Sequence, residues 1–182
     1  LLSGCVRIKT EINIPGPDRV NLSWKINSKS NHLLAWQLKL EELINSSSLN
    51  LKTASYQSGL QEISSSTLRS YEASQIFQKT ITSAASLAGI QLSKPELTLN
   101  ERNLLIAIKQ NLRIKIDLTE LPDVPGLNLQ MSVTKLPPNK NINKASNKLL
   151  LNKTLKIGEI NYFTFNIWRW NRVGLGTIFI FA

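Results

Sequence analysis

Apolar and polar residues alternate in two runs near the start of the chain. The first run has its apolar residues at Val6, Ile8, Ile12 and Ile14, and the second has them at Val20, Leu22, Trp24 and Ile26. The turn-forming sequence Pro15-Gly16-Pro17-Asp18 separates the two runs. A period of two residues is that of a β-strand with one buried face, so this segment predicts an antiparallel hairpin.

The period then changes to that of a helix. Apolar residues recur at helical spacing at Leu33, Trp36, Leu40, Leu43 and Ile44, which predicts a first helix. The serine-rich residues 46–70 alternate weakly and indicate short edge strands joined by loops. A second helix is predicted over residues 71–88, with Ser70 as its N-cap and Gly89 at its end.

Strand-like alternation returns after Pro95. Its phase does not break across Lys109-Gln110-Asn111, so residues 104–118 form either one long bent strand or a hairpin. Further strands are predicted over residues 127–133, 149–157 and 160–168, the last two as a closing hairpin that turns at Gly158-Glu159. The pattern therefore predicts an α+β fold, a mostly antiparallel sheet of about seven to nine strands with two helices packed on it.

Composition limits the kinds of chemistry that the chain can perform. It has 182 residues, one cysteine and one histidine, which excludes an intrachain disulfide and a multi-cysteine metal site. No phosphate-binding loop, dinucleotide fingerprint or zinc spacing is present. The acids Asp117, Glu120 and Asp123 are close enough in sequence to suggest Ca²⁺ ligands, but a solvated strand end explains them as well. We expect no enzyme activity, no cofactor and no metal.

The N-terminus resembles a lipoprotein cleavage site. The sequence Leu1-Leu2-Ser3-Gly4-Cys5 has small residues directly before a cysteine, as in the lipobox of bacterial lipoproteins. We expect residues 1–4 to be the end of a signal peptide and Cys5 to be lipidated. The alternative is a buried cysteine at the start of a strand.

The C-terminus has the composition of a membrane boundary. The sequence Trp168-Arg169-Trp170-Asn171-Arg172 precedes the uncharged apolar residues 173–182. We expect Trp168, Arg169, Trp170 and Arg172 at the membrane interface, and residues 171–182 as the start of a transmembrane helix, since about 20 residues are needed to span a bilayer. The alternative is a final core strand. Residues 5–170 would form one extracytoplasmic domain, with Cys5 and Val173 close to the same membrane surface.

A net charge of +10 favours a negatively charged partner, although a lysine-rich surface can also have no specific partner. Six lysines occur without an acidic residue in a loop-rich segment, and we expect them to contact anionic headgroups. They are Lys135, Lys140, Lys144, Lys148, Lys153 and Lys156. A solvated loop is the alternative. Nucleic-acid binding is not expected, because stacking aromatic residues do not accompany these lysines.

Several of these segments together resemble a known family. They are the lipobox, the strand start Val6-Arg7-Ile8, residues 103–118, and residues 165–176. The chain resembles the cyanobacterial membrane proteins catalogued as domain of unknown function 3153, which are similar in layout to the mycobacterial lipoprotein LppM. The resemblance implies a lipoprotein signal, a β-rich extracytoplasmic domain and one C-terminal membrane helix. It places the domain on the periplasmic side of the membrane or in the thylakoid lumen.

Two functions are compatible with this location. The first is lipid or glycolipid binding, which the resemblance implies and for which Trp24, Trp36 and Phe77 would line an apolar cavity. These residues are otherwise ordinary core. The second is a structural or assembly factor that docks on another membrane protein, which an exposed apolar patch without a cavity would favour.

Overall fold

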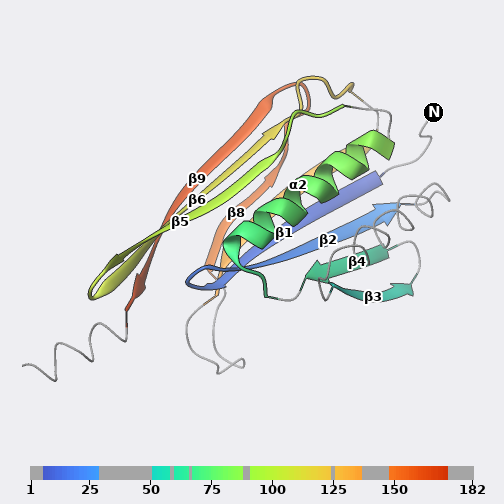
Figure 1. Ribbon diagram of the computed structural model, residues 1–182. Coiled ribbons are helices and arrows are strands. Elements are labelled where there is room, and N and C mark those ends of the chain that lie inside the picture. The colour runs from blue at the N-terminus through green and yellow to red at the C-terminus, as the bar shows by residue number, and fades with distance from the viewer. Residues whose placement is uncertain are drawn as a thin grey trace, which may run out of the picture.

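Two β-sheets and one helix make up the described part of the computed structural model (Figure 1). The structure describes residues 6–28, 51–57, 60–65, 67–87, 91–123, 126–136 and 148–171. The large sheet has the strand order β3-β4-β2-β1-β7-β8, and the small sheet has the order β5-β6-β9. The elements are β1 (Val6–Gly16), β2 (Arg19–Ser28), β3 (Leu51–Gln57), β4 (Leu60–Ser65), α2 (Ser70–Leu87), β5 (Glu96–Leu104), β6 (Ala107–Asp117), β7 (Leu127–Lys135), β8 (Lys148–Thr154) and β9 (Ile160–Trp170).

The first hairpin is confirmed. β1 and β2 are antiparallel, with Ile12 opposite Leu22, and the chain turns at Pro17 and Asp18. Asp18 has a φ of 44°, a left-handed conformation that aspartate tolerates better than most residues. The serine-rich stretch also forms strands as expected, with β3 at the edge of the large sheet. One pairing in this sheet is parallel, that of β1 with β7.

The helix α2 begins at Ser70, where three hydrogen bonds satisfy its start. The carboxylate of Glu72 accepts a bond from the main-chain N–H of Arg69 at 2.9 Å. The carboxylate of Asp18, in the β1–β2 turn, accepts bonds from the N–H of Ser70 at 3.1 Å and from its hydroxyl at 2.5 Å. Negative charge at a helix N-terminus is stabilising, so the hairpin turn and the helix support each other. The first helix expected, over residues 33–44, lies outside the described residues.

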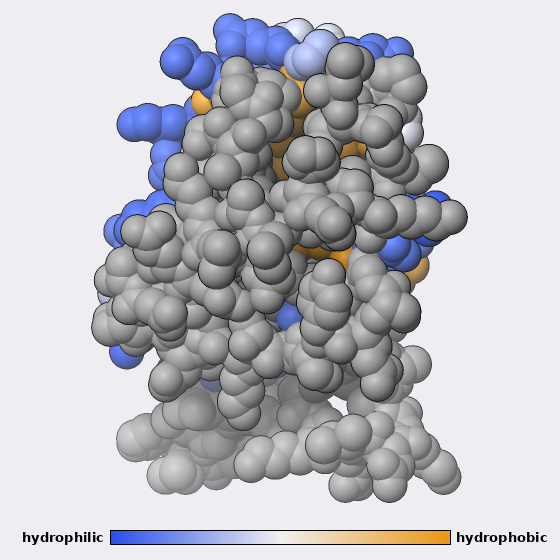
Figure 2. All heavy atoms as spheres, turned by 90° about the vertical axis from the view of Figure 1, so that its right-hand side faces the viewer, coloured by the Kyte–Doolittle hydropathy of each residue, from blue (hydrophilic) through white to orange (hydrophobic). Residues whose placement is uncertain are grey.

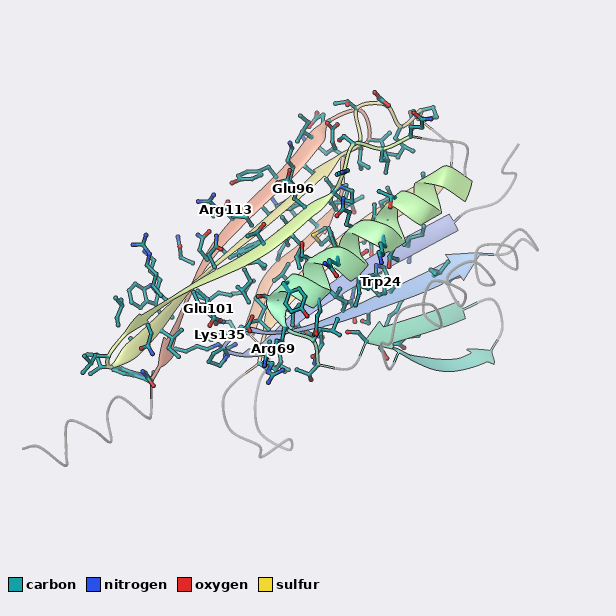
Figure 3. All side chains as sticks on the ribbon, in the orientation of Figure 1. Trp24, Arg69, Glu96, Glu101, Arg113 and Lys135 are labelled. Atoms are coloured by element: carbon teal, nitrogen blue, oxygen red, sulfur yellow. The ribbon has the colours of Figure 1, made fainter. Side chains whose placement is uncertain are left out.

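The hydrophobic core lies between the inner face of the large sheet on one side and α2 with the small sheet on the other (Figures 1 and 3). Trp24 of β2 and Phe77 of α2 are 2% and 0% exposed, and both belong to one cluster of buried residues. A fully buried side chain of this size contributes about 1.5–3 kcal/mol to stability. Both residues therefore pack as core, which was the alternative to cavity walls. Trp36 lies outside the described residues.

The expectation of one sheet with a closing hairpin is wrong. β8 pairs with β7 in the large sheet, whereas β9 pairs with β6 in the small sheet. The connecting segment is held to both sheets, because Leu155 donates to the carbonyl of Leu129 at 2.7 Å and Gly158 donates to that of Leu118 at 3.0 Å. Gly158 has a φ of 78°, which suits a turn between sheets as well as a turn within a hairpin. The alternation of apolar and polar residues predicts a strand, but it does not indicate which sheet the strand joins.

The question left open at Lys109-Gln110-Asn111 is resolved in favour of one strand, because all three residues lie within β6, and the chain makes its hairpin turn earlier. β5 and β6 are antiparallel, with Leu104 opposite Ala107, and the chain turns at Leu105 and Ile106. Leu105 adopts a φ of 50° in this turn. Leucine rarely adopts this conformation, and the turn contains no glycine, asparagine or aspartate. The sequence therefore lacks the usual signal for a hairpin here.

The two ends of the described chain lie at opposite ends of the molecule (Figure 1). Val6 starts β1, whereas the side chain of Arg169, near the end of β9, bonds to the carbonyl of Ile14 at the other end of β1. Eight residues of strand separate Val6 from Ile14, a distance of about 26 Å. Cys5 and Val173 lie outside the described residues, so the expectation that both are close to one membrane surface stays a prediction, and the positions of Val6 and Arg169 count against it.

Candidate membrane-contact surface

The outer face of the small sheet exposes large apolar side chains. Alternate residues of β9 point outward, and their partners on β6 and β5 continue the same face. Trp170 is 74% exposed and Trp168 is 52% exposed. The exposed large apolar residues on this face are Leu104, Ile160, Tyr162, Trp168 and Trp170. A cluster of this kind indicates an interaction site more often than a plain solvated surface.

The apolar character is strongest at the β5–β6 tip, which we define as Leu104, Leu105 and Ile106. These three side chains are 47%, 66% and 43% exposed. The end of β9 is fixed to the tip, because Asn171 donates from its main-chain N–H to the carbonyl of Ile106 at 2.9 Å. Its side-chain amide also donates to Asn103 at 2.8 Å. Trp170 therefore stays beside the tip.

Basic residues accompany the aromatic ones on this face. Lys109 lies opposite both Arg102 and Trp168, and its ammonium group is 5.5 Å from the centre of the Trp168 ring. Such a cation–π contact keeps the charge beside the aromatic ring. Arg113 follows further along β6 and points outward (Figure 3). The outward-facing acids in these rows, Glu96 and Asp117, lie at the end of the sheet away from the tip.

Arg169 was expected at the membrane interface, but the structure buries its side chain. It is 9% exposed and points inward, because it alternates with Trp168 and Trp170 along β9. Its guanidinium donates to the side-chain oxygen of Gln110 at 2.7 Å, to the carbonyl of Leu136 at 3.1 Å and to the carbonyl of Ile14 at 2.5 Å. Burial lowers its pKa, and the nearby carboxylate of Glu101 acts in the opposite direction. Arg169 thus joins the two sheets and does not face outward.

Gln110 and Glu101 complete an inter-sheet polar cluster with Arg169. The side-chain amide of Gln110 donates to the carboxylate of Glu101 and, at 3.2 Å, to the carbonyl of Gly16. Glu101 also accepts from the main-chain N–H of Asp18 at 2.6 Å. The sequence patterns did not single out Gln110 or Glu101 as site residues. The available signal was a polar residue, Gln110, in the apolar phase of the run that continues with Leu112.

Of the six lysines expected to contact anionic headgroups, the four that the structure describes are not together. Lys135 and Lys148 are opposite each other on β7 and β8, at the same end as the tip. Lys135 donates to the carbonyl of Trp168 at 2.6 Å, and its pKa is lowered by burial and by the charges of Arg169 and Lys148. Lys156 is at the other end, paired with Glu159 at 3.3 Å. Lys153 is exposed on β8, and Lys140 and Lys144 lie outside the described residues.

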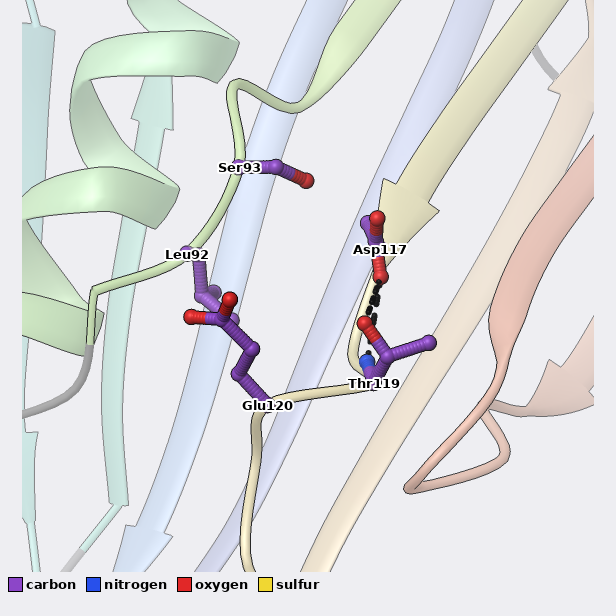
Figure 4. Close-up of a pocket in the computed structure, with 5 residues that line it drawn as sticks. All are labelled: Leu92, Ser93, Asp117, Thr119 and Glu120. Atoms are coloured by element: carbon purple, nitrogen blue, oxygen red, sulfur yellow. Dashed lines mark hydrogen bonds between the residues drawn. The ribbon is translucent and has the colours of Figure 1, made fainter.

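The end of the molecule away from the tip is rich in polar residues, although Ile160 and Tyr162 are exposed there. Figure 2 looks at the right-hand side of Figure 1, and hydrophilic residues gather along its upper rim. Asp117 accepts bonds from the N–H and the hydroxyl of Thr119 at 3.1 and 2.6 Å, which lower its pKa (Figure 4). The adjacent pocket, between Leu92, Ser93 and Glu120, has a volume of about 20 Å³, little more than one water molecule needs. No metal-binding cluster is found among the described residues.

The outer face of the large sheet is also charged, and its lysines Lys9 and Lys25 are paired with Glu11. Glu11 is 2.7 Å from the ammonium group of Lys9 and 3.2 Å from that of Lys25. Burial alone would raise the pKa of Glu11, but the bonds to both lysines outweigh it and lower this pKa below 4.5. The two faces thus differ, since the small sheet has unneutralised basic residues near its tip.

The two predicted membrane anchors belong to the terminal segments of the chain. Cys5, Arg172 and residues 173–182 lie outside the described residues, so lipidation and the transmembrane helix remain predictions. Within the described ranges, no helix is long and apolar enough to cross a membrane.

Residues 10–182 match the family described as Protein of unknown function (DUF3153). This match confirms the family resemblance seen in the sequence, while a cyanobacterial origin and a likeness to LppM remain predictions. No curated protein and no solved structure matches the chain.

Proposed function

The chain belongs to the DUF3153 family, and we propose that it is the extracytoplasmic domain of a membrane-anchored protein that binds anionic lipid. The observation that carries this proposal is the outer face of the small sheet. It combines exposed Trp168 and Trp170 with the basic residues Arg102, Lys109 and Arg113. Tryptophan and basic residues are the side chains that membrane interfaces favour.

The basic residues of this face are sufficient for measurable binding to an anionic membrane. A lysine or arginine near an anionic membrane contributes about 1 kcal/mol, so Arg102, Lys109 and Arg113 together favour binding by about 3 kcal/mol. Exposed apolar side chains at the tip add to this by leaving water. Electrostatic attraction and apolar transfer together are typical of proteins that bind at the bilayer surface.

We propose contact with the bilayer surface and not storage of one lipid in a cavity. Trp24 and Phe77 are packed in the core, and the described residues line a pocket of only about 20 Å³ beside Asp117. A lipid-sized ligand needs a cavity of about 300 Å³ or more. Among the described parts of the chain, the exposed sheet face is therefore the better site for lipid.

Cys5 remains the proposed lipidation site, and its position relative to the tip has a consequence. Its neighbour Val6 is at the end of β1 that lies away from the tip. A diacylglyceryl group on Cys5 and the apolar residues 173–182 in one bilayer would require the long axis of the domain to lie along the membrane.

Intact mass spectrometry of membrane-extracted protein tests lipidation, because an unmodified chain that retains residues 1–4 would exclude it.

Vesicle binding tests the main proposal. The chain with Cys5→Ser is sedimented with phosphatidylcholine vesicles that contain or lack phosphatidylglycerol. We expect binding only to the anionic vesicles, and a loss of about tenfold or more when Arg102→Glu and Lys109→Glu are combined. The matched control combines Lys94→Glu and Lys153→Glu, which changes the net charge equally at exposed positions outside the face. Equal losses in both variants would contradict a specific role for the face.

The same experiment addresses the alternative function. An assembly factor that docks on a membrane protein would also need an exposed apolar surface. If the unaltered chain binds no vesicle of either composition, lipid binding is excluded and docking on a protein becomes the better explanation of the exposed tryptophans.

A further inference from the structure

We infer that the β5–β6 tip, Leu104-Leu105-Ile106, inserts into the apolar layer of the bilayer, so that the small sheet of the chain without a lipid on Cys5 stands on the membrane by this end. This inference rests on the proposed function, because it specifies how the outer face of the small sheet meets lipid. The tip would enter the hydrocarbon layer, which the basic residues and the tryptophans do not do by themselves.

The tip exposes apolar surface at an extremity of the molecule (Figure 1). Leu105 is 66% exposed, and its flanking residues Leu104 and Ile106 are 47% and 43% exposed. Hairpin turns in water usually carry glycine, asparagine or aspartate, which suit both the solvent and a positive φ. Leu105 has a φ of 50° and a side chain that water solvates poorly. An apolar environment around the tip would accommodate these side chains.

The residues above the tip change along the sheet in the same order as the layers of a membrane. The row nearest the tip contains Leu104, Ala107 and Trp170, and the next row, about 7 Å away, contains Arg102, Lys109 and Trp168. The third row consists of Asn100, Asn111 and Asn166.

The rows further from the tip contain charged residues and, furthest away, the exposed side chains of Tyr162 and Ile160. Arg113 lies in the row about 20 Å from the Leu104 row, and Glu96 lies about 27 Å from it. From the tip outward the first four rows are apolar, aromatic with basic, neutral polar, and then two threonines with Arg113, and acids appear only in the rows beyond. Hydrocarbon, the interface with its tryptophans and cations, and water follow one another in this order across a membrane.

The sheet holds the tip firmly enough to insert it as a unit. Asn171 bonds to Asn103 and Ile106 on either side of the turn. Below the tip, Arg169 joins β9 to the carbonyl of Ile14 in the large sheet. The chain then continues from Asn171 into the apolar sequence of residues 173–182.

The occupant that fits this surface is a bilayer and not a protein groove. The apolar tip is small and is followed by a row with two cations, Arg102 and Lys109, and no acid. A phospholipid surface offers anionic phosphates at the depth where this row would lie, above a fluid apolar layer that needs no shape complementarity.

Depth-dependent fluorescence tests the insertion. In the full chain with Cys5→Ser, an environment-sensitive dye is attached to Leu105→Cys and, in a second variant, to Thr164→Cys, which lies opposite Arg113 on the same face. Vesicles contain phosphatidylglycerol and lipids brominated in their acyl chains. We expect a blue shift and strong quenching at position 105, with little change at position 164. Equal quenching at both positions would mean that the sheet lies flat and would overturn the inference.

A second pair of variants separates insertion from surface binding. Leu105→Ser is compared with Leu149→Ser, because Leu149 is 56% exposed on β8 and is not part of the tip. We expect Leu105→Ser to weaken partitioning into anionic vesicles about tenfold and Leu149→Ser to leave it unchanged. If vesicles still sediment both variants equally and the dye at position 105 is not quenched, the insertion is wrong while lipid binding stands. If no variant sediments, the proposed function has failed as well.

Discussion

The guanidinium of Arg169 donates a 2.5 Å hydrogen bond to the main-chain carbonyl of Ile14, a residue 155 positions earlier in the chain. This bond connects β9 of the small sheet with β1 of the large sheet, directly below the exposed tryptophans. Gln110 and Glu101 join the same inter-sheet polar cluster. The cluster holds the β5–β6 tip in a constant position relative to the rest of the molecule.

Replacement of Arg169 tests the cluster. We expect Arg169→Met to lower the free energy of unfolding by about 3 kcal/mol, because it leaves Gln110, Leu136 and Ile14 without a buried donor. Urea unfolding followed by tryptophan fluorescence measures the change. The control is Arg113→Met, an exposed residue of β6 for which we expect a change within about 0.5 kcal/mol. Similar values for both variants would show that Arg169 adds no more than a surface arginine does.

Leu105→Gly is expected to affect stability and membrane binding in opposite directions. Glycine adopts a φ of 50° without steric cost, whereas leucine in this conformation costs about 1 kcal/mol. The free energy of unfolding should therefore rise by about 0.5–1 kcal/mol, as thermal unfolding can measure. Partitioning into anionic vesicles should fall, since an apolar side chain is lost from the tip. A decrease in both quantities would mean that the exposed leucine stabilises the fold.

The pH dependence of stability should include a contribution from Asp18. The hydroxyl and N–H of Ser70 lower the pKa of Asp18 below its ordinary value of 3.8. Its stabilising contribution is therefore complete above about pH 3.8 and is lost as the pH falls through the lowered value.

Asp18→Asn removes this titration and keeps a residue that tolerates positive φ. We expect it to lower the free energy of unfolding at pH 7 by about 0.5 kcal/mol, the effect of one charge at a helix N-terminus, and to match the unaltered chain at strongly acidic pH. Urea unfolding over a pH series measures both. The control is Asp123→Asn, in an exposed loop. In this variant the free energy of unfolding should change between pH 7 and strongly acidic pH by the same amount as in the unaltered chain.

Salt should separate the electrostatic and apolar parts of membrane binding. The screening length falls from about 10 Å at 0.1 M salt to about 3 Å at 1 M, which weakens the contribution of Arg102, Lys109 and Arg113. We expect vesicle binding to decrease with salt but not to vanish, because apolar transfer of the tip is not screened. Sedimentation at both salt concentrations measures this. If the variant that combines Arg102→Glu and Lys109→Glu binds vesicles with no dependence on salt, these two residues are the source of the dependence. If vesicle binding by this variant depends on salt as in the unaltered chain, they are not.

Local patterns predicted individual elements well because they depend on near neighbours in sequence. The alternation that ends at Ile14 and restarts at Val20 reproduces β1 and β2, and the expected helix over residues 71–88 corresponds to α2. The same alternation places Trp168 and Trp170 on one face of β9 and Arg169 on the other. The alternation therefore indicated that Arg169 would be buried. Its charge and its aromatic neighbours suggested instead that it lies at a membrane interface.

The sequence by itself determined most of the strands, the helix α2, the basic excess and the two tryptophans that flank Arg169, because each follows from composition or from a short period. Only the tertiary structure decided which strands share a sheet, that β8 and β9 are apart, and that Leu105 turns the chain at an exposed tip. Strand pairing depends on the burial of faces that are distant in sequence, and the same alternation is compatible with many pairings. The inter-sheet polar cluster exists only after that pairing is made, when Arg169 meets the carbonyl of Ile14.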